Sequence, residues 1–210
     1  MPGLHDDRSH LADRLRERGI TDERVLAAMS AVPRELFVPE DVAGEAYADV
    51  PLGIGQGQTI STPWIVAFSA AALGEFPAGA RVLEVGTGSG YGAAVLAACG
   101  ASVVTVERYP ELAEQARRTL AATGYGDVAV RTGDGLAGAP DLAPFDGIVV
   151  TAMAQRRLPP ALLEQLAPDG VLLCPVGDGA EGTLVRHHRD RDDKLADVRF
   201  VPLVPGAPSD

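Results

Sequence analysis

The sequence contains few aromatic residues, cysteines and basic residues. Of its 210 residues, 5% are aromatic and two are cysteines, and 18 lysines and arginines face 29 aspartates and glutamates, a net charge of −11 at pH 7. Two isolated cysteines, Cys99 and Cys174, cannot form a zinc site or a disulfide framework, and their apolar flanks favour reduced thiols in a core. The acidic balance disfavours binding to nucleic acid or to an anionic membrane surface, because both need basic residues.

The sequence also lacks long apolar segments. No stretch reaches the roughly 18 apolar residues of a transmembrane helix, and residues 1–7 have neither the basic start nor the apolar run of a signal peptide. The hydrophobic content of 46% is typical of a globular protein of one domain. We therefore expect a single domain over residues 1–210, cytoplasmic and monomeric, without a metal site.

The spacing of apolar residues changes near residue 80. Before this point it predicts helices within 8–31 and over 64–73; the first region is broken at Gly19, with Thr21 as the N-cap of its second helix. After this point strands alternate with helices. The predicted strands are 81–85, 102–106, 128–131, 145–151, 171–176, 183–188 and 198–204, and the predicted helices are 91–99, 110–122 and 159–166.

This alternation predicts an α/β fold with a doubly wound, mostly parallel sheet. An N-terminal helical extension precedes the sheet, and the last strands are expected to form an antiparallel edge. Along the chain we expect a helical cap over 8–50, a substrate and cofactor loop over 51–63, and the core over 78–205.

Residues suited to bind a ligand follow three consecutive predicted strands. Glu84 and a glycine loop (86–90) end the first strand, Glu107 ends the second, and Asp134 with Gly135 follows the third. Glycines let the backbone approach a ligand, and a carboxylate about 20 residues beyond the loop is placed to accept hydrogen bonds from ribose hydroxyls. Because the carboxyl ends of parallel strands meet at one edge, the pattern predicts a nucleoside cofactor, whose adenine edge Asp134 and Gly135 could bind.

The glycine loop also narrows the choice of nucleoside. Its spacing is G-x-G-x-G rather than the dinucleotide fingerprint, and the sequence contains no P-loop. Glu84 stands at the head of the loop without a basic neighbour, which disfavours a pyrophosphate and suits a cofactor with a cationic centre. S-adenosylmethionine, a sulfonium attached to adenosine, fits both observations.

Nine segments carry a resemblance to a known family. They are residues 32–39, 46–49, 51–61, 82–91, 133–135, 143–146, 165–168, 175–177 and 198–203. With them the sequence resembles the protein-L-isoaspartate O-methyltransferase family over roughly residues 10–205. The block GQTIS at residues 57–61 is the most diagnostic, because other S-adenosylmethionine enzymes share only the glycine loop. The resemblance implies a seven-stranded sheet of the Rossmann-like methyltransferase type.

The resemblance also implies the reaction. The enzyme transfers a methyl group from S-adenosylmethionine to the α-carboxylate of an L-isoaspartyl residue in a damaged protein or peptide, leaving S-adenosylhomocysteine. The ester closes to a succinimide, whose hydrolysis returns some normal aspartate, so the reaction repairs protein. A carboxylate is already ionised at pH 7, so the transfer needs orientation rather than a general base.

The resemblance assigns roles to individual residues. Contacts to the substrate fall to Asp49, Thr59, Ile60 and Ser61, and the Ser61 hydroxyl would hold the carboxylate as the catalytic group. Contacts to the cofactor fall to Gln58, Glu84, Gly86, Thr87, Gly88, Ser89, Gly90, Glu107, Arg108, Gly133, Asp134 and Gly135. Two of these residues have a local alternative: Ser61 could cap the helix that begins near residue 64, and Asp134 could cap a turn.

Other functions stay open at this point. The sequence departs from the family pattern at Trp64, Leu136 and Met153, near the expected peptide site. These departures favour a related enzyme that methylates an aspartate of one dedicated ribosomal peptide to form an aspartimide, whereas the intact block at residues 57–61 and the short length favour repair. A nucleic-acid or small-molecule methyltransferase is disfavoured because no Asn/Asp-Pro-Pro-Tyr motif follows the fourth strand of the core. A module that only binds the cofactor is disfavoured because Ser61 is present.

Overall fold

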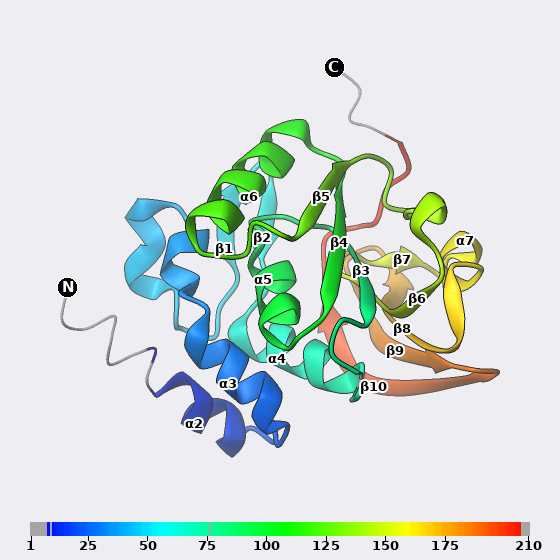
Figure 1. Ribbon diagram of the computed structural model, residues 1–210, viewed down its shortest axis with the longest axis horizontal. Helices are drawn as coiled ribbons and strands as arrows, with labels where there is room; N and C mark the ends of the chain where they lie inside the picture. Colours follow the sequence, from blue (N-terminus) through cyan, green and yellow to red (C-terminus); the bar gives the residue numbers. More distant parts are fainter. Residues whose placement is uncertain (1–7, 9, 76, 207–210) are drawn as a thin grey trace.

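A computed structural model describes residues 8, 10–75 and 77–206 (Figure 1). Within these residues one sheet contains eight strands, seven of which follow the order β10-β9-β8-β6-β3-β4-β5. The eighth, β7 (Ala154–Gln155), pairs with β8 outside this order. The strands β3 (Arg81–Val85), β4 (Ser102–Glu107), β5 (Ala129–Thr132), β6 (Phe145–Val150) and β8 (Leu166–Asp178) are parallel. The antiparallel edge consists of β9 (Glu181–His188) and β10 (Arg191–Arg199). The predicted α/β class and antiparallel edge are confirmed.

The two faces of the sheet are apolar and separately covered. Val82, Val149 and Leu173 belong to one buried cluster and Leu83, Ile148 and Leu172 to another, as the period of two along a strand requires. Helices α4 (Pro63–Ala72), α5 (Tyr91–Ala98) and α6 (Pro110–Ala122) contribute to the first cluster, while α7 (Pro160–Leu163) contributes to the second, which lies beside the short helix η3 (Pro140–Leu142). Both cysteines are buried and free, as predicted.

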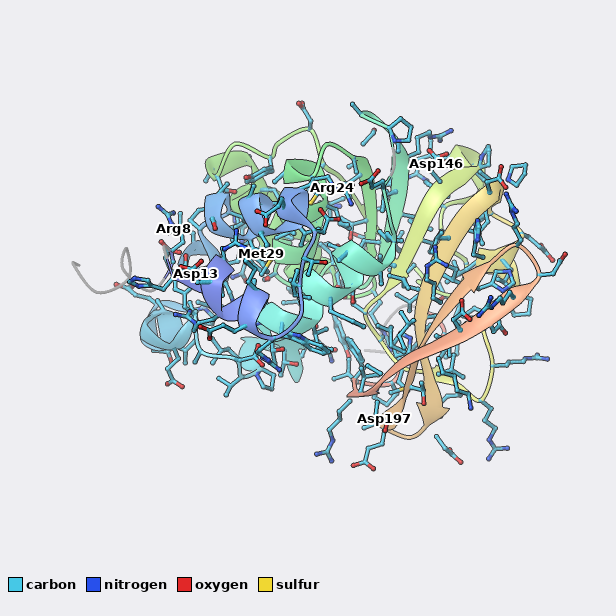
Figure 2. The ribbon with its side chains drawn as sticks, turned by 90° about the horizontal axis from the view of Figure 1, so that it is seen from below. Arg8, Asp13, Arg24, Met29, Asp146 and Asp197 are labelled. Carbon is cyan, nitrogen blue, oxygen red and sulfur yellow. The ribbon has the colours of Figure 1, made fainter. Side chains whose placement is uncertain are left out.

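The N-terminal extension forms a further layer against α4 and α5. Helices α2 (Leu11–Glu17) and α3 (Glu23–Ala31) are followed by the short helices η1 (Arg34–Phe37) and η2 (Glu40–Glu45). Figure 2 shows this extension, with Asp13 and Arg24, on one side of the molecule and the strands that carry Asp146 and Asp197 on the other. The predicted cap at Thr21 is wrong: the Asp22 carboxylate accepts the first amides of α3 instead.

The segment predicted as a loop over 51–63 contains a hairpin. Strands β1 (Leu52–Gly55) and β2 (Gln58–Ile60) pair antiparallel, with Leu52 opposite Ile60. The turn between them has positive φ at Gln56 and Gly57 (53° and 66°), the geometry of a tight hairpin turn. The hairpin fixes which side chains of the diagnostic block face the core.

The end of the sheet also differs from the prediction. β10 spans Arg191–Arg199 rather than 198–204, because the charged residues expected in a turn form an exposed edge strand. β8 begins at Leu166 and shortens the helix predicted over 159–166 to α7. The chain after β10 is then free to return across the carboxyl ends of the central strands.

Candidate functional site

A cleft, here called the glycine-loop cleft, lies at the carboxyl ends of β3, β4, β5 and β6. These are adjacent parallel strands, with β4 and β5 on one side of β3 and β6 on the other. Open α/β sheets bind ligands where the strand order reverses in this way. The cleft is lined by Gln58, Thr59, Val85, Gly86, Gly88, Val106, Glu107, Arg108, Tyr109, Gly135, Thr151, Ala152, Val201, Pro202, Leu203 and Val204.

Glycine is required at two positions of this cleft. Gly86 has φ +99°, and a Cβ atom there would lie 2.2 Å from the Thr151 hydroxyl. A Cβ atom on Gly135 would lie 2.6 Å from Cγ1 of Val85. Both distances are shorter than real Cβ atoms show. The backbone at Gly86 and Gly135 therefore lies closer to Thr151 and Val85 than a residue with a side chain would allow. The result is a bare backbone floor suited to a flat ligand.

Glu107 is buried at the end of β4 with its carboxylate fixed. One oxygen accepts the amide of Gly88 at 2.8 Å and the other accepts the amide of Tyr109 at 3.0 Å. Each carboxylate oxygen keeps a second lone pair for another donor. Glu107 is therefore an oriented acceptor at the wall of the cleft, as hydroxyl groups of a ribose would require.

Glu84 lies outside the glycine-loop cleft, in a buried network of polar side chains. The Thr105 hydroxyl donates to Glu84 at 2.7 Å, and the Thr87 hydroxyl lies 2.7 Å from that of Thr105. A Cβ atom on Gly92 would lie 2.3 Å from the Glu84 carboxylate, so only glycine lets α5 cover it. Burial, helped by the nearby charge of Glu107, raises the pKa of Glu84 to about 8 despite the hydrogen bond from Thr105. A neighbouring cation would favour its ionised form.

Three cavities meet at Thr151. The first is the glycine-loop cleft. The second, the Glu84 cavity, is lined by Ser61, Ile65, Val66, Ser69, Ala70, Glu84, Gly92, Val95, Leu96, Val149, Val150, Thr151 and Phe200. The third, the outer groove, is lined by Arg18, Asp49, Pro51, Thr59, Ser61, Thr62, Trp64, Ile65, Thr151, Asp197, Val198, Arg199, Phe200 and Val201. Ser61 lies between the Glu84 cavity and the outer groove, and Thr59 between the outer groove and the glycine-loop cleft.

Ser61 does not cap the helix that follows it. The N-cap of α4 is Thr62, whose hydroxyl accepts the amide of Ile65 at 3.3 Å, and Pro63 is the first helical residue. Within the described part of the chain the Ser61 hydroxyl has no hydrogen-bond partner. The hydroxyl is thus available to a ligand at the boundary of two cavities.

Asp49, predicted as a substrate contact, anchors the start of α4 in the structure. Its carboxylate accepts the Trp64 amide at 2.9 Å and pairs with Arg18, which follows α2. Partial burial opposes ionisation, but the hydrogen bonds from Trp64, Arg18 and Thr62 outweigh it and hold the pKa of Asp49 below its usual value. Asp49 lines the outer groove at some remove from the glycine-loop cleft.

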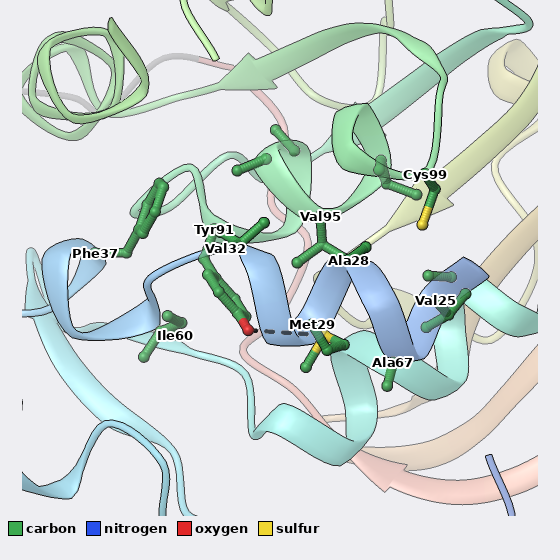
Figure 3. Packing of buried hydrophobic residues seen from close by; sticks show 14 of the residues in the cluster. Val25, Ala28, Met29, Val32, Phe37, Ile60, Ala67, Tyr91, Val95 and Cys99 are labelled. Atoms are coloured by element: carbon green, nitrogen blue, oxygen red, sulfur yellow. Dashed lines mark hydrogen bonds between the residues drawn. The ribbon is translucent and has the colours of Figure 1, made fainter. Parts of the chain in front are cut away.

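Several predicted contact residues do not line the glycine-loop cleft. Ile60 is buried in the core near Phe37 and Tyr91 rather than lining the substrate pocket (Figure 3). The Asp134 carboxylate accepts the amides of Leu136 and Gly206, so it caps the turn there, and its contact with the cofactor stays a prediction. Asp49, Ser61 and Glu84 line the two neighbouring cavities instead. The remaining ones, which form the backbone and inner side of the loops, are Thr87, Ser89, Gly90 and Gly133. By contrast, Gln58, Thr59, Gly86, Gly88, Glu107, Arg108 and Gly135 line it.

Two parts of the cleft are formed by residues that were not predicted to bind a ligand. Thr151 follows β6, and its hydroxyl donates to the carbonyls of Val85 and Gly86 at 3.0 and 2.8 Å. Its place as the polar last residue of the fourth predicted strand, 145–151, was a signal for it. Residues 201–204 cross the cleft because Met153 exchanges backbone hydrogen bonds with Val201 and Leu203. No local pattern in the sequence indicates this return.

The departures from the family pattern have different surroundings. Trp64 stacks on Phe68 with ring centroids 4.7 Å apart and lines the outer groove, where a peptide could contact it. Met153 is fully buried beside Leu184 and Val198, so its side chain cannot contact a substrate. Only the first of these two departures lies on a surface that a substrate can reach.

The described part of the chain lacks two further features. Among residues 8, 10–75 and 77–206, no group of three or more His, Cys, Asp or Glu side chains could hold a metal ion. In the same part of the chain, no helix is both long and apolar enough to cross a membrane.

Comparison with known proteins identifies the family. Residues 6–207 match the family model described as protein-L-isoaspartate(D-aspartate) O-methyltransferase. The chain belongs to this family. It is 50% identical over 204 residues to the protein-L-isoaspartate O-methyltransferase of Methanoregula boonei, covering 95% of this chain and 93% of that protein. The corresponding protein of Gloeobacter violaceus is 50% identical over 209 residues, covering 94% and 98%. The resemblance and enzyme class inferred from the sequence are confirmed.

A solved structure supports the same fold. The chain superposes with a TM-score of 0.81 on a protein-L-isoaspartate O-methyltransferase from Plasmodium falciparum, which was crystallised with S-adenosyl-L-homocysteine. The two are 27% identical, and the alignment covers 94% of this chain and 97% of the other. The predicted methyltransferase type of the sheet is therefore confirmed.

Proposed function

We propose that this protein transfers a methyl group from S-adenosylmethionine to the α-carboxylate of L-isoaspartyl residues in proteins or peptides, and so starts their repair. One observation carries the proposal: the free hydroxyl of Ser61 lies where the outer groove meets the Glu84 cavity. A carboxylate bound in the outer groove would lie beside this hydroxyl, because Ser61 is part of the groove's lining. Membership of the family supports the same reaction.

The chain's own residues fit the cofactor. The bare backbone at Gly86 and Gly135 can take a flat adenosyl group, and Glu107 can accept ribose hydroxyls with the lone pairs that Gly88 and Tyr109 leave free. Glu84 lies on the side of β3 that faces Ser61 and suits the positive end of the molecule. When bound, S-adenosylmethionine supplies an electrophilic methyl group on a sulfonium.

Ser61 acts as the catalytic residue by orientation. Its hydroxyl donates one hydrogen bond to the substrate carboxylate and so aims the free oxygen into the site. Because that carboxylate is ionised at pH 7, no side chain has to remove a proton. A neutral hydroxyl also holds the ground state less tightly than a cation would, which leaves the oxygen nucleophilic. Thr59 and the wall of the outer groove hold the flanking peptide.

Two peptides that differ only in L-isoaspartate or L-aspartate at one position test the reaction. The protein is expected to methylate the isoaspartyl peptide alone, with methyl ester and succinimide followed by mass spectrometry. Turnover on the aspartyl peptide, or on neither, would contradict repair and favour an aspartate in a dedicated peptide.

The variant Ser61→Ala tests the assigned role. Turnover should fall by about 10- to 100-fold, since a misplaced reactant costs rates of this order, while the dissociation constant of S-adenosylhomocysteine stays within about twofold of the wild-type value. Equal loss of turnover and of cofactor affinity would show that Ser61 does not act by holding the substrate. Ser69→Ala, in the lining of the same cavity, is the matched control.

The setting of the reaction belongs to the same proposal. The substrate is a protein or peptide rather than nucleic acid, consistent with a net charge of −11. The protein works as a monomer in the cytoplasm. Residues 8–50 act as a cap, residues 51–63 as the loop between substrate and cofactor, and residues 78–205 as the methyltransferase core.

A further inference from the structure

Arg34 is the largest polar side chain that is fully buried in the described structure. Its exposed fraction is 0%, and no carboxylate of the described residues forms an ion pair with it. Burial lowers the pKa of its guanidinium, although nearby groups, Tyr91 first among them, act in the other direction. A buried charge without a carboxylate partner is costly to fold. A contribution to stability therefore does not explain why an arginine is buried at this position.

The hydrogen bonds of Arg34 join two separate segments. Its Nε atom donates to the carbonyl of Ala46 at 2.6 Å, and its Nη2 atom donates to the carbonyl of Ser61 at 2.7 Å. Ala46 closes η2 in the N-terminal extension, while Ser61 directly precedes the N-cap of α4. The planar guanidinium thus sets the distance between two backbone segments in a way that a flexible ammonium cannot.

The ring of Tyr91 fixes the other side of the guanidinium. The Arg34 guanidinium lies 4.8 Å from the centre of this ring. Tyr91 is the first residue of α5, directly after the glycine loop. Its ring packs edge-on against Phe37 at 5.6 Å, and its hydroxyl contacts the sulfur of Met29, as Figure 3 shows. Arg34 is therefore held against the element that carries the cofactor loop.

We propose that Arg34 is a positioning residue for methyl transfer: by holding the Ser61 carbonyl against the start of α5, it fixes the Ser61 hydroxyl relative to the glycine-loop cleft. The proposal rests on the role of Ser61 given above. Arg34 itself is covered on all sides and touches neither of the reacting molecules. It acts on the reaction only through Ser61.

A double-mutant cycle tests this dependence. Arg34→Lys keeps the positive charge but cannot hold both carbonyls in one plane. In the wild-type background it should lower kcat on the isoaspartyl peptide by about 10-fold. In the Ser61→Ala background the same change should lower kcat by less than about twofold, because residues that act as a unit are not additive. Equal effects in both backgrounds would overturn the proposal.

A measurement on the ligand-free protein separates this role from general stability. Hydrogen exchange of the amides in residues 59–65 should be faster in Arg34→Lys than in wild type, while the dissociation constant of S-adenosylhomocysteine changes by less than about twofold. Unchanged exchange in this segment would overturn the proposal. If Arg34→Lys does not fold at the assay temperature, Arg34→Gln, which keeps one donor group, is measured in the same way.

Arg186→Lys is the matched control. Arg186 donates from Nε to the carbonyl of Ala72 at 2.9 Å and so holds the other end of α4. Its replacement by lysine should lower the melting temperature but leave the hydrogen exchange of residues 59–65 unchanged. It should also have the same effect on kcat with and without Ser61→Ala. If Arg186→Lys also lowers kcat in the wild-type background but not in the Ser61→Ala background, then any loosening of α4 disturbs Ser61. That result would overturn a specific role of Arg34. A wild-type protein without turnover contradicts the proposed function, and the exchange measurement then still decides whether Arg34 holds Ser61.

Discussion

At the scale of single residues, two carboxylates on neighbouring strands have different surroundings. Glu107 accepts two backbone amides at the wall of the glycine-loop cleft. Glu84 receives one hydroxyl and is enclosed by α5. Burial of the second carboxylate favours its neutral form and raises its pKa. The same residue type can thus serve as a fixed acceptor in one place and as a group that responds to charge in another.

Glu107→Ala should weaken binding of S-adenosylhomocysteine by about 10- to 100-fold, because a hydrogen bond to a charged group contributes about 1.5–3 kcal/mol. The dissociation constant is measured by calorimetry. Glu111→Ala, an exposed carboxylate in the first turn of α6, is the control and should leave it unchanged. An unchanged constant for Glu107→Ala would contradict the assignment of ribose binding to this residue.

Glu84 predicts a pH dependence of stability. Its pKa is raised from 4.5 to about 8 in the folded protein, so the unfolded chain loses this proton at lower pH than the folded chain. Folding stability from this group is complete below pH 4.5 and is lost as the pH rises to about 8, with a slope of about 1 kcal/mol per pH unit. Urea unfolding of wild type and Glu84→Gln from pH 5 to pH 8 should show this slope in their difference. A difference independent of pH would show that Glu84 is ionised throughout.

At the scale of elements, the glycine loop and the β1–β2 hairpin contribute to the site in different ways. The loop gives close backbone approach, and the hairpin alternates its residues between core and site. Thr59 lines two cavities while the next residue, Ile60, is buried in the core. The sequence alone places both residues in one diagnostic block, but the strand period decides which of them a ligand can reach.

Gly86→Ala should destabilise the protein by about 1–3 kcal/mol and weaken cofactor binding. Its Cβ atom would lie 2.2 Å from the Thr151 hydroxyl, at a φ of +99° that alanine rarely adopts. Gly53→Ala in β1 is the control, since no atom lies within 4 Å of the added Cβ, and its effect should stay within about 0.5 kcal/mol. Chemical denaturation measures both variants. Similar stability losses in the two would contradict a specific contact at Thr151.

At the scale of the whole molecule, the site forms from distant parts of the chain. Gln58 from the hairpin, Glu107 from the central sheet and residues 201–204 from the end of the chain line one cleft. The tail reaches it through backbone hydrogen bonds to Met153 rather than through its own side chains. A ligand in the cleft therefore contacts segments that have no common element of secondary structure.

S-adenosylhomocysteine at 100 times its dissociation constant should stabilise the protein by about 2.7 kcal/mol. Hydrogen exchange should slow together in residues 57–61 and 201–204, because both segments line the cleft. Residues 189–190, in the turn between β9 and β10, are the internal control and should not change. Protection of only one of the two segments would show that the ligand does not bridge them.

By itself the sequence determined the alternation of strands and helices, the glycine loop, and the carboxylates at two strand ends. These features follow from local spacing and from the absence of side chains at glycines, so they can be predicted without knowing which residues are in contact in the fold. The tertiary structure alone decided that residues 201–204 enter the site, that Asp134 holds Gly206, and that Ile60 faces the core. The reason is physical: each of these depends on hydrogen bonds or packing between residues far apart in the chain, and no local pattern records which partner the folded backbone will bring.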